Sequence, residues 1–179
     1  MSTPQPDREA RFRALYADAY PDVLAFAQRR GHPSHAEDVV AEAFLVVWRR
    51  FDEAPKRSGD ARAWIFGIAR HCLLNARRGQ GRQDALAVRI ASAPPAGDEP
   101  GEPSGELIDL AAAWKKLGPK DQEALALAVF EDLTSAQAAR VLGVSAASYR
   151  IRLMRARRAL RAHLTPTSFA AAPMMEAQP

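Results

Sequence analysis

The most informative pattern in the sequence lies towards its C-terminal end, where residues 134–145 read TSAQAARVLGVS and residues 146–160 read AASYRIRLMRARRAL. A helix, a short turn containing glycine and a second helix make up the helix-turn-helix of many DNA-binding modules. Thr134 and Ser145 suit the N-cap positions of the two helices, and Gly143 suits the turn between them. The pattern predicts a helix-turn-helix in this part of the chain.

The second helix of this pattern separates an apolar stripe from a basic face. At about 100° per residue, one narrow sector holds the expected core residues: Tyr149, Leu153, Ala156 and Leu160. The opposite side carries Ile151, Met154, Arg155 and Arg158. Arginine binds guanine edges bidentately, and apolar side chains contact the thymine methyl group. The flanking arginines lie where phosphates are expected: Arg150, Arg152, Arg157 and Arg161.

Positive charge is concentrated at the same end of the chain. Seven arginines and one acidic residue, Glu176, lie between residues 133 and 179, whereas the whole chain carries a net charge of +4. The remainder of the chain is therefore net acidic. Charge segregated in this way favours a polyanionic partner for one end of the molecule. The alternative is an amphipathic helix whose arginines only keep it in solution.

Helical periodicity also fills the first 80 residues, and no segment alternates as a strand does. The spacing of apolar residues predicts helices over residues 10–30, 36–50 and 61–78. Pro21 is expected to open a second helix within the first of these, because proline is tolerated at the first helical position. The S-x-x-E form of Ser34 to Glu37 predicts a capping box, and Asp60 is the expected N-cap of the third helix. The fold class is predicted to be all-α.

A second basic patch follows Asp60. Five arginines and one histidine, with no acidic residue among them, lie between residues 62 and 82: Arg62, Arg70, His71, Arg77, Arg78 and Arg82. Trp64 and Phe66 lie nearby, and each base stacked on such a side chain contributes about 1–3 kcal/mol. The alternative for Trp64 is a core position, because Trp64, Ile68 and Cys72 recur every four residues.

The composition changes sharply between the two halves. Residues 93–105 contain four prolines, three glycines, three acidic residues and no basic one. Such a segment buries too little apolar surface to offset its ordering entropy, so a flexible acidic linker is expected. The predicted organisation is a helical domain over residues 10–82, a linker over 83–106, a helix-turn-helix domain over 107–163 and a disordered tail over 164–179. The last domain is expected to contain helices over residues 107–117, 120–131, 134–142 and 146–163.

Several classes of protein do not fit this sequence. A single cysteine, Cys72, excludes an intramolecular disulfide framework and suits a reducing compartment. The longest uncharged apolar run, residues 124–130, is far shorter than the roughly 20 residues of a membrane span, and residues 1–12 lack the apolar stretch of a signal peptide. A cytoplasmic protein without membrane insertion is expected.

Motifs for catalysis and cofactor binding do not occur in the sequence. It has no G-x-x-x-x-G-K-[ST] loop and no G-x-S-x-G turn. The four histidines lack metal-ligand spacing: His32, His35, His71 and His163. We therefore expect no enzyme activity, no cofactor and no metal site.

Residues 36–50 (AEDVVAEAFLVVWRR) and residues 63–70 (AWIFGIAR) resemble region 2 of the sigma factors of bacterial RNA polymerase. Residues 133–145 and 149–157 resemble region 4 of the same family. The chain has no room for a region-3 domain, which is typical of the extracytoplasmic-function (ECF) group. His71 and Asn75 depart from the family pattern, which often has asparagine and an acidic residue at these positions.

The resemblance implies a function in transcription initiation. The chain would bind core RNA polymerase through the β′ clamp helices and the β flap and direct it to promoters, with Asp38 and Glu42 on the surface that docks the clamp helices. The acidic linker would pass through the active-site and RNA-exit channel. An anti-sigma factor is an expected further partner.

The resemblance also assigns DNA contacts, to duplex and to melted promoter DNA. The loop over residues 52–60 and the helix after it would recognise and open the −10 element through Arg57, Arg62, Trp64, Arg70, His71, Asn75, Arg77 and Arg78. The helix-turn-helix would read the −35 element through Ser145, Ser148, Arg150, Ile151, Arg152, Met154, Arg155 and Arg158. A base unstacked from the −10 strand would enter a pocket of the N-terminal domain.

Two other functions remain open from the sequence alone. One is an ordinary helix-turn-helix repressor or activator, which would bind its site without polymerase, usually as a dimer on a palindrome. The other is an enzyme, which the absence of catalytic motifs disfavours.

Overall fold

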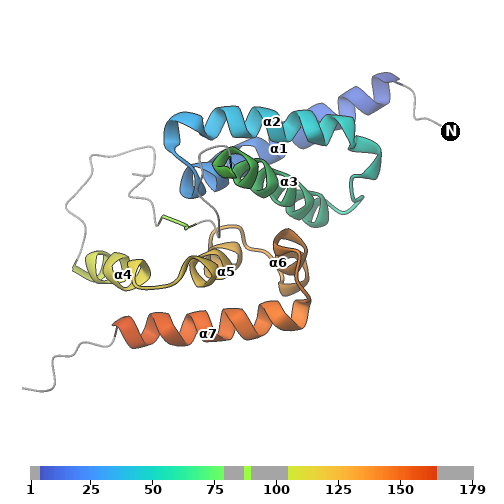
Figure 1. Cartoon of the computed structure of the whole chain (residues 1–179). Helices are drawn as coiled ribbons and strands as arrows, with labels where there is room; N and C mark the ends of the chain where they lie inside the picture. Colours follow the sequence, from blue (N-terminus) through green and yellow to red (C-terminus); the bar gives the residue numbers. More distant parts are fainter. Residues whose placement is uncertain (1–4, 79–86, 90–104, 165–179) are drawn as a thin grey trace, which may run out of the picture.

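The structure is a computed structural model that describes residues 5–78, 87–89 and 105–164, and over these residues every regular element is a helix (Figure 1). The seven α-helices are α1 (Gln5–Arg30), α2 (Ala36–Arg49), α3 (Ser58–Arg78), α4 (Gly105–Lys115), α5 (Pro119–Val129), α6 (Ser135–Leu142) and α7 (Ala146–Leu164). Two 3₁₀ turns, η1 (Pro33–His35) and η2 (Phe51–Glu53), flank α2. The predicted all-α class is confirmed.

Helices α1, α2 and α3 pack against one another in the N-terminal half. Their apolar faces meet in a core whose central side chains, Val23, Phe26, Val40 and Phe66, are fully buried. The rings of Phe26 and Phe66 stack with centroids 5.0 Å apart. The helical spacing of apolar residues therefore identified the buried faces of this bundle correctly.

Helix α1 continues through Pro21, so the predicted break at this residue is wrong. Proline has no N–H, and the carbonyl of Ala17 loses its helical hydrogen bond. Both Pro21 and Ala17 are exposed, which leaves that carbonyl accessible to water, while Ala19 and Val23 anchor the opposite face in the core. Tertiary packing thus outweighs the local cost of the proline.

Both N-caps predicted in this half are also wrong. The N-cap of α2 is His35, without a side-chain hydrogen bond, because Ser34 lies inside η1 and its Oγ is 2.7 Å from Nδ1 of His32. Helix α3 begins at Ser58, two residues before Asp60. The Asp60 carboxylate instead accepts hydrogen bonds from α6 of the other half, as described below.

The C-terminal half contains the predicted helix-turn-helix. Thr134 and Gln137 form a capping box at the start of α6, and Gly143 ends α6 in the left-handed conformation, with a φ of 67°. The buried hydroxyl of Tyr149 in α7 donates a hydrogen bond of 2.9 Å to the carbonyl oxygen of Ala124 in α5. This bond and the apolar contacts of α7 with α4, α5 and α6 fix the orientation of α7.

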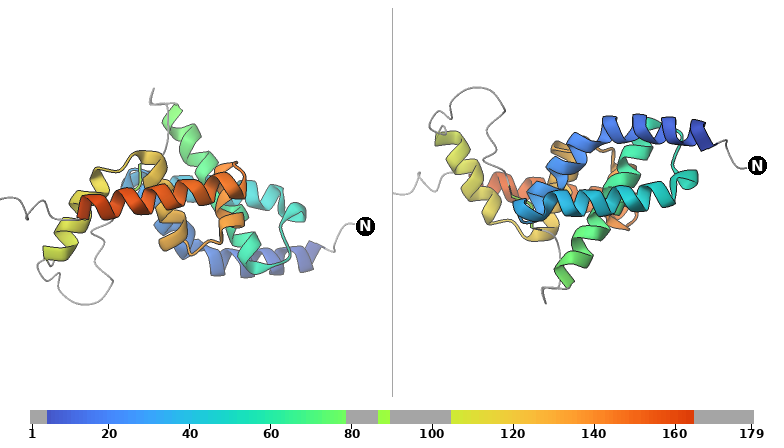
Figure 2. Two further views of the ribbon diagram at one scale, coloured as in Figure 1. Left: turned by 90° about the horizontal axis from the view of Figure 1, so that it is seen from below. Right: turned by 90° about the horizontal axis from the view of Figure 1, so that it is seen from above.

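The two halves lie directly against each other. Helices α1–α3 form one side of the molecule and α4–α7 the other, with α6 packed on α3 (Figures 1 and 2). Most of the expected linker and the tail from residue 165 lie outside the described residues. No helix in the described ranges has the length and apolar character needed to cross a bilayer.

Substitution of Gly143 tests the conformation of the turn. A Cβ at Gly143 or at Gly105 meets no atom within 4 Å, but only Gly143 has a positive φ. Gly143→Ala is therefore expected to lower the free energy of unfolding by about 1–2 kcal/mol, the cost of the left-handed conformation for an L-residue. Gly105→Ala is the control and should leave stability unchanged or slightly raised. Urea titrations of both variants measure the difference, and equal effects would contradict the assigned turn.

Candidate nucleic-acid interface

Helix α7 buries one stripe and exposes the other, as its angular pattern predicted. Tyr149, Leu153 and Ala156 are buried. On the outward side Ile151 is 49% exposed and Met154 is 63% exposed, an unusual position for two large apolar side chains. The remaining outward positions are polar or basic and exposed: Ser145, Ser148, Arg150, Arg155 and Arg158. The result is an exposed face that combines apolar groups with arginines.

The first turn of α7 is held by its own side chains. The Oγ of Ser145 accepts a hydrogen bond from the backbone N–H of Ser148, at 3.1 Å, and the Ser145 hydroxyl donates to the Ser148 Oγ, at 2.9 Å. The predicted N-cap at Ser145 is therefore confirmed. Arg152 is half-buried and borders the outward face rather than pointing out from it.

Part of the predicted −10 surface on α3 is exposed. The side chains of Arg57, His71 and Asn75 are exposed, whereas Trp64 is half-buried and packs against the core. Phe66 is completely buried, so no base can stack on it, and its predicted part in stacking is wrong. Phe66 follows the core side of α3, where its ring packs on Phe26.

The arginines of α3 bind other protein groups. Nε of Arg62 lies 2.8 Å from the carboxylate of Asp22 in α1. Arg77 donates to the backbone carbonyl of Arg30, at 3.4 Å. Of Arg78 the structure describes only the backbone, which belongs to the last turn of α3.

Arg70 makes the most extensive of these contacts. Its Nε and one of its terminal nitrogens donate to the two carboxylate oxygens of Glu123, at 2.6 and 3.1 Å. Glu123 belongs to α5, in the other half of the molecule, and its side chain is only 3% exposed. In this arrangement the Arg70 guanidinium is bound by a carboxylate of the other half.

A groove of about 660 Å³ lies between α3 and α6. Trp64, His71 and Cys72 line it from α3, and Arg140 and Val141 line it from α6. Trp64 and His71 belong to the predicted −10 surface, so the groove lies along part of that surface. Helix α6 forms its opposite wall.

The acidic residues that are predicted to dock the polymerase lie on an exposed face of α2. Asp38 and Glu42 are one helical turn apart, so they share a face, and both are exposed. The carboxylate of Asp38 lies 3.9 Å from Nδ1 of His35 and is otherwise directed to solvent, with 85% of the side chain exposed. This face is available for contact with a basic partner surface.

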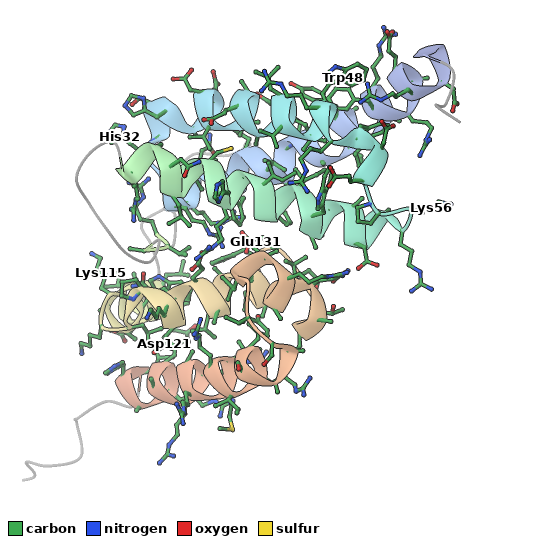
Figure 3. All side chains as sticks on the ribbon, turned by 45° about the vertical axis from the view of Figure 1, so that its right-hand side comes forward. His32, Trp48, Lys56, Lys115, Asp121 and Glu131 are labelled. Atoms are coloured by element: carbon green, nitrogen blue, oxygen red, sulfur yellow. The ribbon has the colours of Figure 1, made fainter. Side chains whose placement is uncertain are left out.

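Sequence reasoning missed a set of acidic residues that join the two halves. Asp60 accepts hydrogen bonds from Gln137, at 3.3 Å, and from Arg140, and the pKa of its carboxyl group is lowered by Arg140 first and Gln137 second. Glu131, after α5, lies between the halves (Figure 3) and binds Arg30. The signal in the sequence was the presence of two carboxylates, Glu123 and Glu131, at the borders of the apolar run 124–130.

Two family models match the chain, and together they cover more than half of it. The model described as Sigma-70 region 2 matches residues 15–83, and the model described as Sigma-70, region 4 matches residues 107–160.

Curated proteins and solved structures agree with these matches. The chain is 29% identical over 155 residues to the ECF RNA polymerase sigma factor SigL of Mycobacterium tuberculosis, a match that covers 85% of this chain and 88% of that protein. It is 29% identical over 163 residues to the ECF RNA polymerase sigma factor BldN of Streptomyces coelicolor, covering 87% of this chain and 60% of that protein.

Two solved structures share the fold. The sigma factor RpoE in complex with the anti-sigma factor NepR, from Bartonella quintana, has a TM-score of 0.64 and 25% identity, and the match covers 86% of this chain and 96% of that one. CnrH in complex with the cytosolic domain of CnrY has a TM-score of 0.58 and 23% identity, covering 87% of this chain and 88% of that one.

The reactivity of Cys72 tests the packing beside the groove. Burial, and secondarily the Glu42 carboxylate, raise the pKa of the Cys72 thiol to about 11. At pH 8 the thiolate fraction should then be about 100-fold below that of a thiol with its ordinary pKa, and the thiolate is the nucleophile. The rate of reaction with an aromatic disulfide reagent is expected to fall by at least this factor relative to the same chain in urea. A native rate within tenfold of the unfolded rate would contradict the assigned burial.

Proposed function

The chain belongs to the ECF group of the sigma-70 family, and from this premise we propose how its residues divide the work of promoter recognition. A sigma factor binds core RNA polymerase and directs it to promoters, and this is the function of the chain. The presence of both family regions, in order, argues against an ordinary repressor or activator. The family consists of initiation factors and not of enzymes.

We propose that residues 10–82 bind the polymerase and the −10 element and that residues 107–163 bind the −35 element. Residues 83–106 are the linker that passes through the polymerase channel, and residues 164–179 form a tail without an assigned role. The chain acts in the cytoplasm, where polymerase and promoter DNA are found.

The proposal for the −35 element rests on the outward face of α7. Arg155 and Arg158 are exposed beside the apolar Ile151 and Met154, a combination that suits guanine edges next to thymine methyl groups. Arg150 and the half-buried Arg152 border this face, together with Ser145 and Ser148 at the start of the helix. These flanking groups contact phosphates and set the register of α7 on the duplex.

The proposal for the −10 element rests on the face of α3 that holds Trp64 and His71. Trp64 and His71 lie on the α3 wall of the groove described above, where they could meet an unstacked base. Arg70 lines the same groove. The other proposed contacts lie just before α3 or on it: Arg57, Arg62, Asn75, Arg77 and Arg78. Unstacking costs a few kcal/mol, and specific contacts in the groove offset it.

Protein partners use other surfaces. Asp38 and Glu42, exposed on one face of α2, dock the β′ clamp helices, and the helix-turn-helix domain contacts the β flap. An anti-sigma factor is a further partner, and this proposal is supported by the fold shared with RpoE, which was solved in complex with the anti-sigma factor NepR.

In vitro transcription tests the function itself. Core polymerase is incubated with a library of promoter fragments, with and without the chain, and the transcripts are sequenced. We expect initiation at a defined subset of fragments that share an upstream and a downstream element, only when the chain is present. Equal initiation without the chain would overturn the proposal.

Arg155→Ala tests the reading face. Loss of a bidentate arginine contact is expected to weaken binding to the upstream element by about 1–3 kcal/mol and to relax sequence preference at the contacted base pair. Lys116→Ala, which removes one exposed charge elsewhere in the same domain, is the matched control. Promoter competition with holoenzyme measures both effects, and an unchanged affinity and preference would exclude Arg155 from base readout.

Asp38→Asn combined with Glu42→Gln tests the docking face. Removal of both charges is expected to weaken binding to core polymerase at least fivefold and to make the remaining binding less sensitive to salt, because charge pairs across an interface are screened. Glu37→Gln, an exposed neighbour about 100° away around the helix, is the control. Affinity is measured by fluorescence anisotropy at two salt concentrations, and equal losses in control and test variants would argue against this face.

A further inference from the structure

The first turns of α1 lie beside the connection between α2 and α3. Both are found at the same end of the molecule (Figures 1 and 2). Helix α1 begins at Gln5, whereas the match to the region 2 family model begins at residue 15. We call residues 50–57 the α2–α3 loop, and this loop overlaps the segment expected to recognise the −10 element. Contacts between the start of α1 and the α2–α3 loop therefore bear on promoter recognition.

Arg8 of α1 makes three kinds of contact at this place. One of its terminal nitrogens donates a hydrogen bond of 2.6 Å to the carbonyl oxygen of Trp48, in the last turn of α2. Its Nε donates to Oδ1 of Asp52, at 3.4 Å. Its guanidinium carbon lies 4.1 Å from the centroid of the Trp48 ring. A single side chain thus joins α1 to the end of α2 and to the α2–α3 loop.

The contact with Trp48 caps α2. The last four carbonyl groups of an α-helix lack a partner within the helix, and a cation is favourable beside them because of the helix dipole. Helix α2 ends at Arg49, and the chain then turns into η2, where the N–H of Glu53 donates to the carbonyl oxygen of Arg50, at 2.9 Å. The guanidinium of Arg8, from 40 residues away, therefore binds α2 where the α2–α3 loop begins.

Aromatic rings surround this contact. The ring of Phe12, one helical turn after Arg8, packs edge-on against the rings of Trp48 and Phe51, with centroids 5.0 and 5.6 Å apart. Phe51 is buried, and the side chain of Arg8 is only 17% exposed. Hydrogen bonds and cation–π contacts both strengthen where water is excluded. The burial of Arg8 therefore favours a fixed position of its guanidinium.

Another ion pair lies within the α2–α3 loop, but it restrains the loop less. Arg50 donates to the two carboxylate oxygens of Glu53, at 3.2 and 2.5 Å. These side chains are 50% and 57% exposed, and exposed pairs contribute little because water and salt screen them. Residues three apart also cannot fix the loop relative to α1. Arg8 supplies that longer-range restraint.

From these contacts we propose that Arg8 is a positioning residue for −10 recognition. Its guanidinium binds the end of α2 and Asp52, and it thereby holds the α2–α3 loop in the conformation that presents Arg57 to the melted strand. Arg57 is exposed at the last position of the loop. The inference rests on the proposed function of this loop, and it adds a residue outside the matched region that acts without touching DNA.

The α2–α3 loop is short enough to transmit this restraint. At one end the N–H of Ala54 donates to the carbonyl oxygen of Phe51 in η2, at 3.1 Å. At the other end the carbonyl oxygen of Arg57 accepts a hydrogen bond of 2.9 Å from the N–H of Ala61 in α3. Pro55 lies between these two ends, and its ring restricts φ. Release of the first end increases the number of conformations open to the loop.

Amide hydrogen exchange in the free, full-length chain tests the restraint itself. Arg8→Ala removes a hydrogen bond from a charged donor, so the amides of Glu53 and Ala54 in η2 are expected to exchange about tenfold faster. Nuclear magnetic resonance measures each amide separately, and the amide of buried Val40, in the middle of α2, should not change. Exchange of the η2 amides at the rate of the control variant would overturn the proposal.

The matched control is Arg13→Ala. Arg13 lies on the same helix and is exposed, and its ion pair, at 3.5 Å, is with Glu9 of the same helix. The two substitutions therefore remove the same charge, but only Arg8→Ala removes a contact with the α2–α3 loop. Circular dichroism establishes that both variants are folded.

Binding of −10 strands by holoenzyme tests the consequence for recognition. Fluorescence anisotropy measures the affinity for single-stranded oligonucleotides that carry each of the four bases at each −10 position. Arg8→Ala is expected to weaken binding of the preferred strand about tenfold and to reduce the difference between bases, with unchanged affinity for core polymerase. A residue that only stabilises the fold would leave the preference between bases unchanged, and that result would overturn the proposal.

Arg8→Lys provides a graded test. Lysine keeps the charge but lacks the planar fork that binds two oxygen atoms while it stacks on a ring. We expect amide exchange and base preference that both lie between those of the original chain and those of Arg8→Ala. A different order of the three chains in the two measurements would overturn the proposal, because positioning requires that they change together.

Arg57→Ala separates this inference from the proposed function. If Arg57→Ala weakens binding of the −10 strand and Arg8→Ala does not, the inference fails while the proposed function stands. If neither variant weakens binding although Arg8→Ala speeds exchange in η2, the assignment of the α2–α3 loop to the −10 element fails.

Discussion

The bidentate ion pair between Arg30 and Glu131 is the contact around which the two halves of the chain are arranged. Both side chains are fully buried, and the pair joins α1 to the segment that follows α5. Arg29 forms a second ion pair with the same Glu131 carboxylate. A buried charge without its partner is strongly unfavourable, so this pair specifies one relative position of the domains. In that position α6 lies on α3 and residues 88 and 89 fit between α1, α4 and α5.

The two surfaces proposed to read DNA differ in exposure in this arrangement. The outward face of α7 is exposed, with Met154 and Arg155 directed away from the rest of the molecule. The α3 face is partly covered, because Arg70 is bound to Glu123 and α6 forms a wall of the groove beside Trp64. In this arrangement the α7 face is exposed, whereas the α3 face is partly covered by the other half of the chain.

Local signals in the sequence were reliable where neighbouring residues decide the structure. Thr134, Gly143 and Ser145 act at the ends of α6 and α7 as predicted, and the angular stripe of Tyr149, Leu153 and Ala156 is buried. Apart from the capping box at Ser34, which is replaced by a contact with His32, they failed where distant residues compete. Asp60 binds α6 instead of capping α3, and Pro21 stays inside α1 because the core holds the opposite face. No local pattern could show that Glu123 and Glu131 meet arginines 53 and 101 residues away.

The central claim is that one chain carries two DNA-reading surfaces to two separate promoter elements. Site-specific photocrosslinking within the complete open complex tests it most directly, with the photoreactive residue placed at His71 on α3 or at Met154 on α7. The account predicts crosslinks from position 71 to the −10 element and from position 154 to the −35 element. Crosslinks from both positions to one stretch of DNA, or the same crosslinks without polymerase, would contradict it.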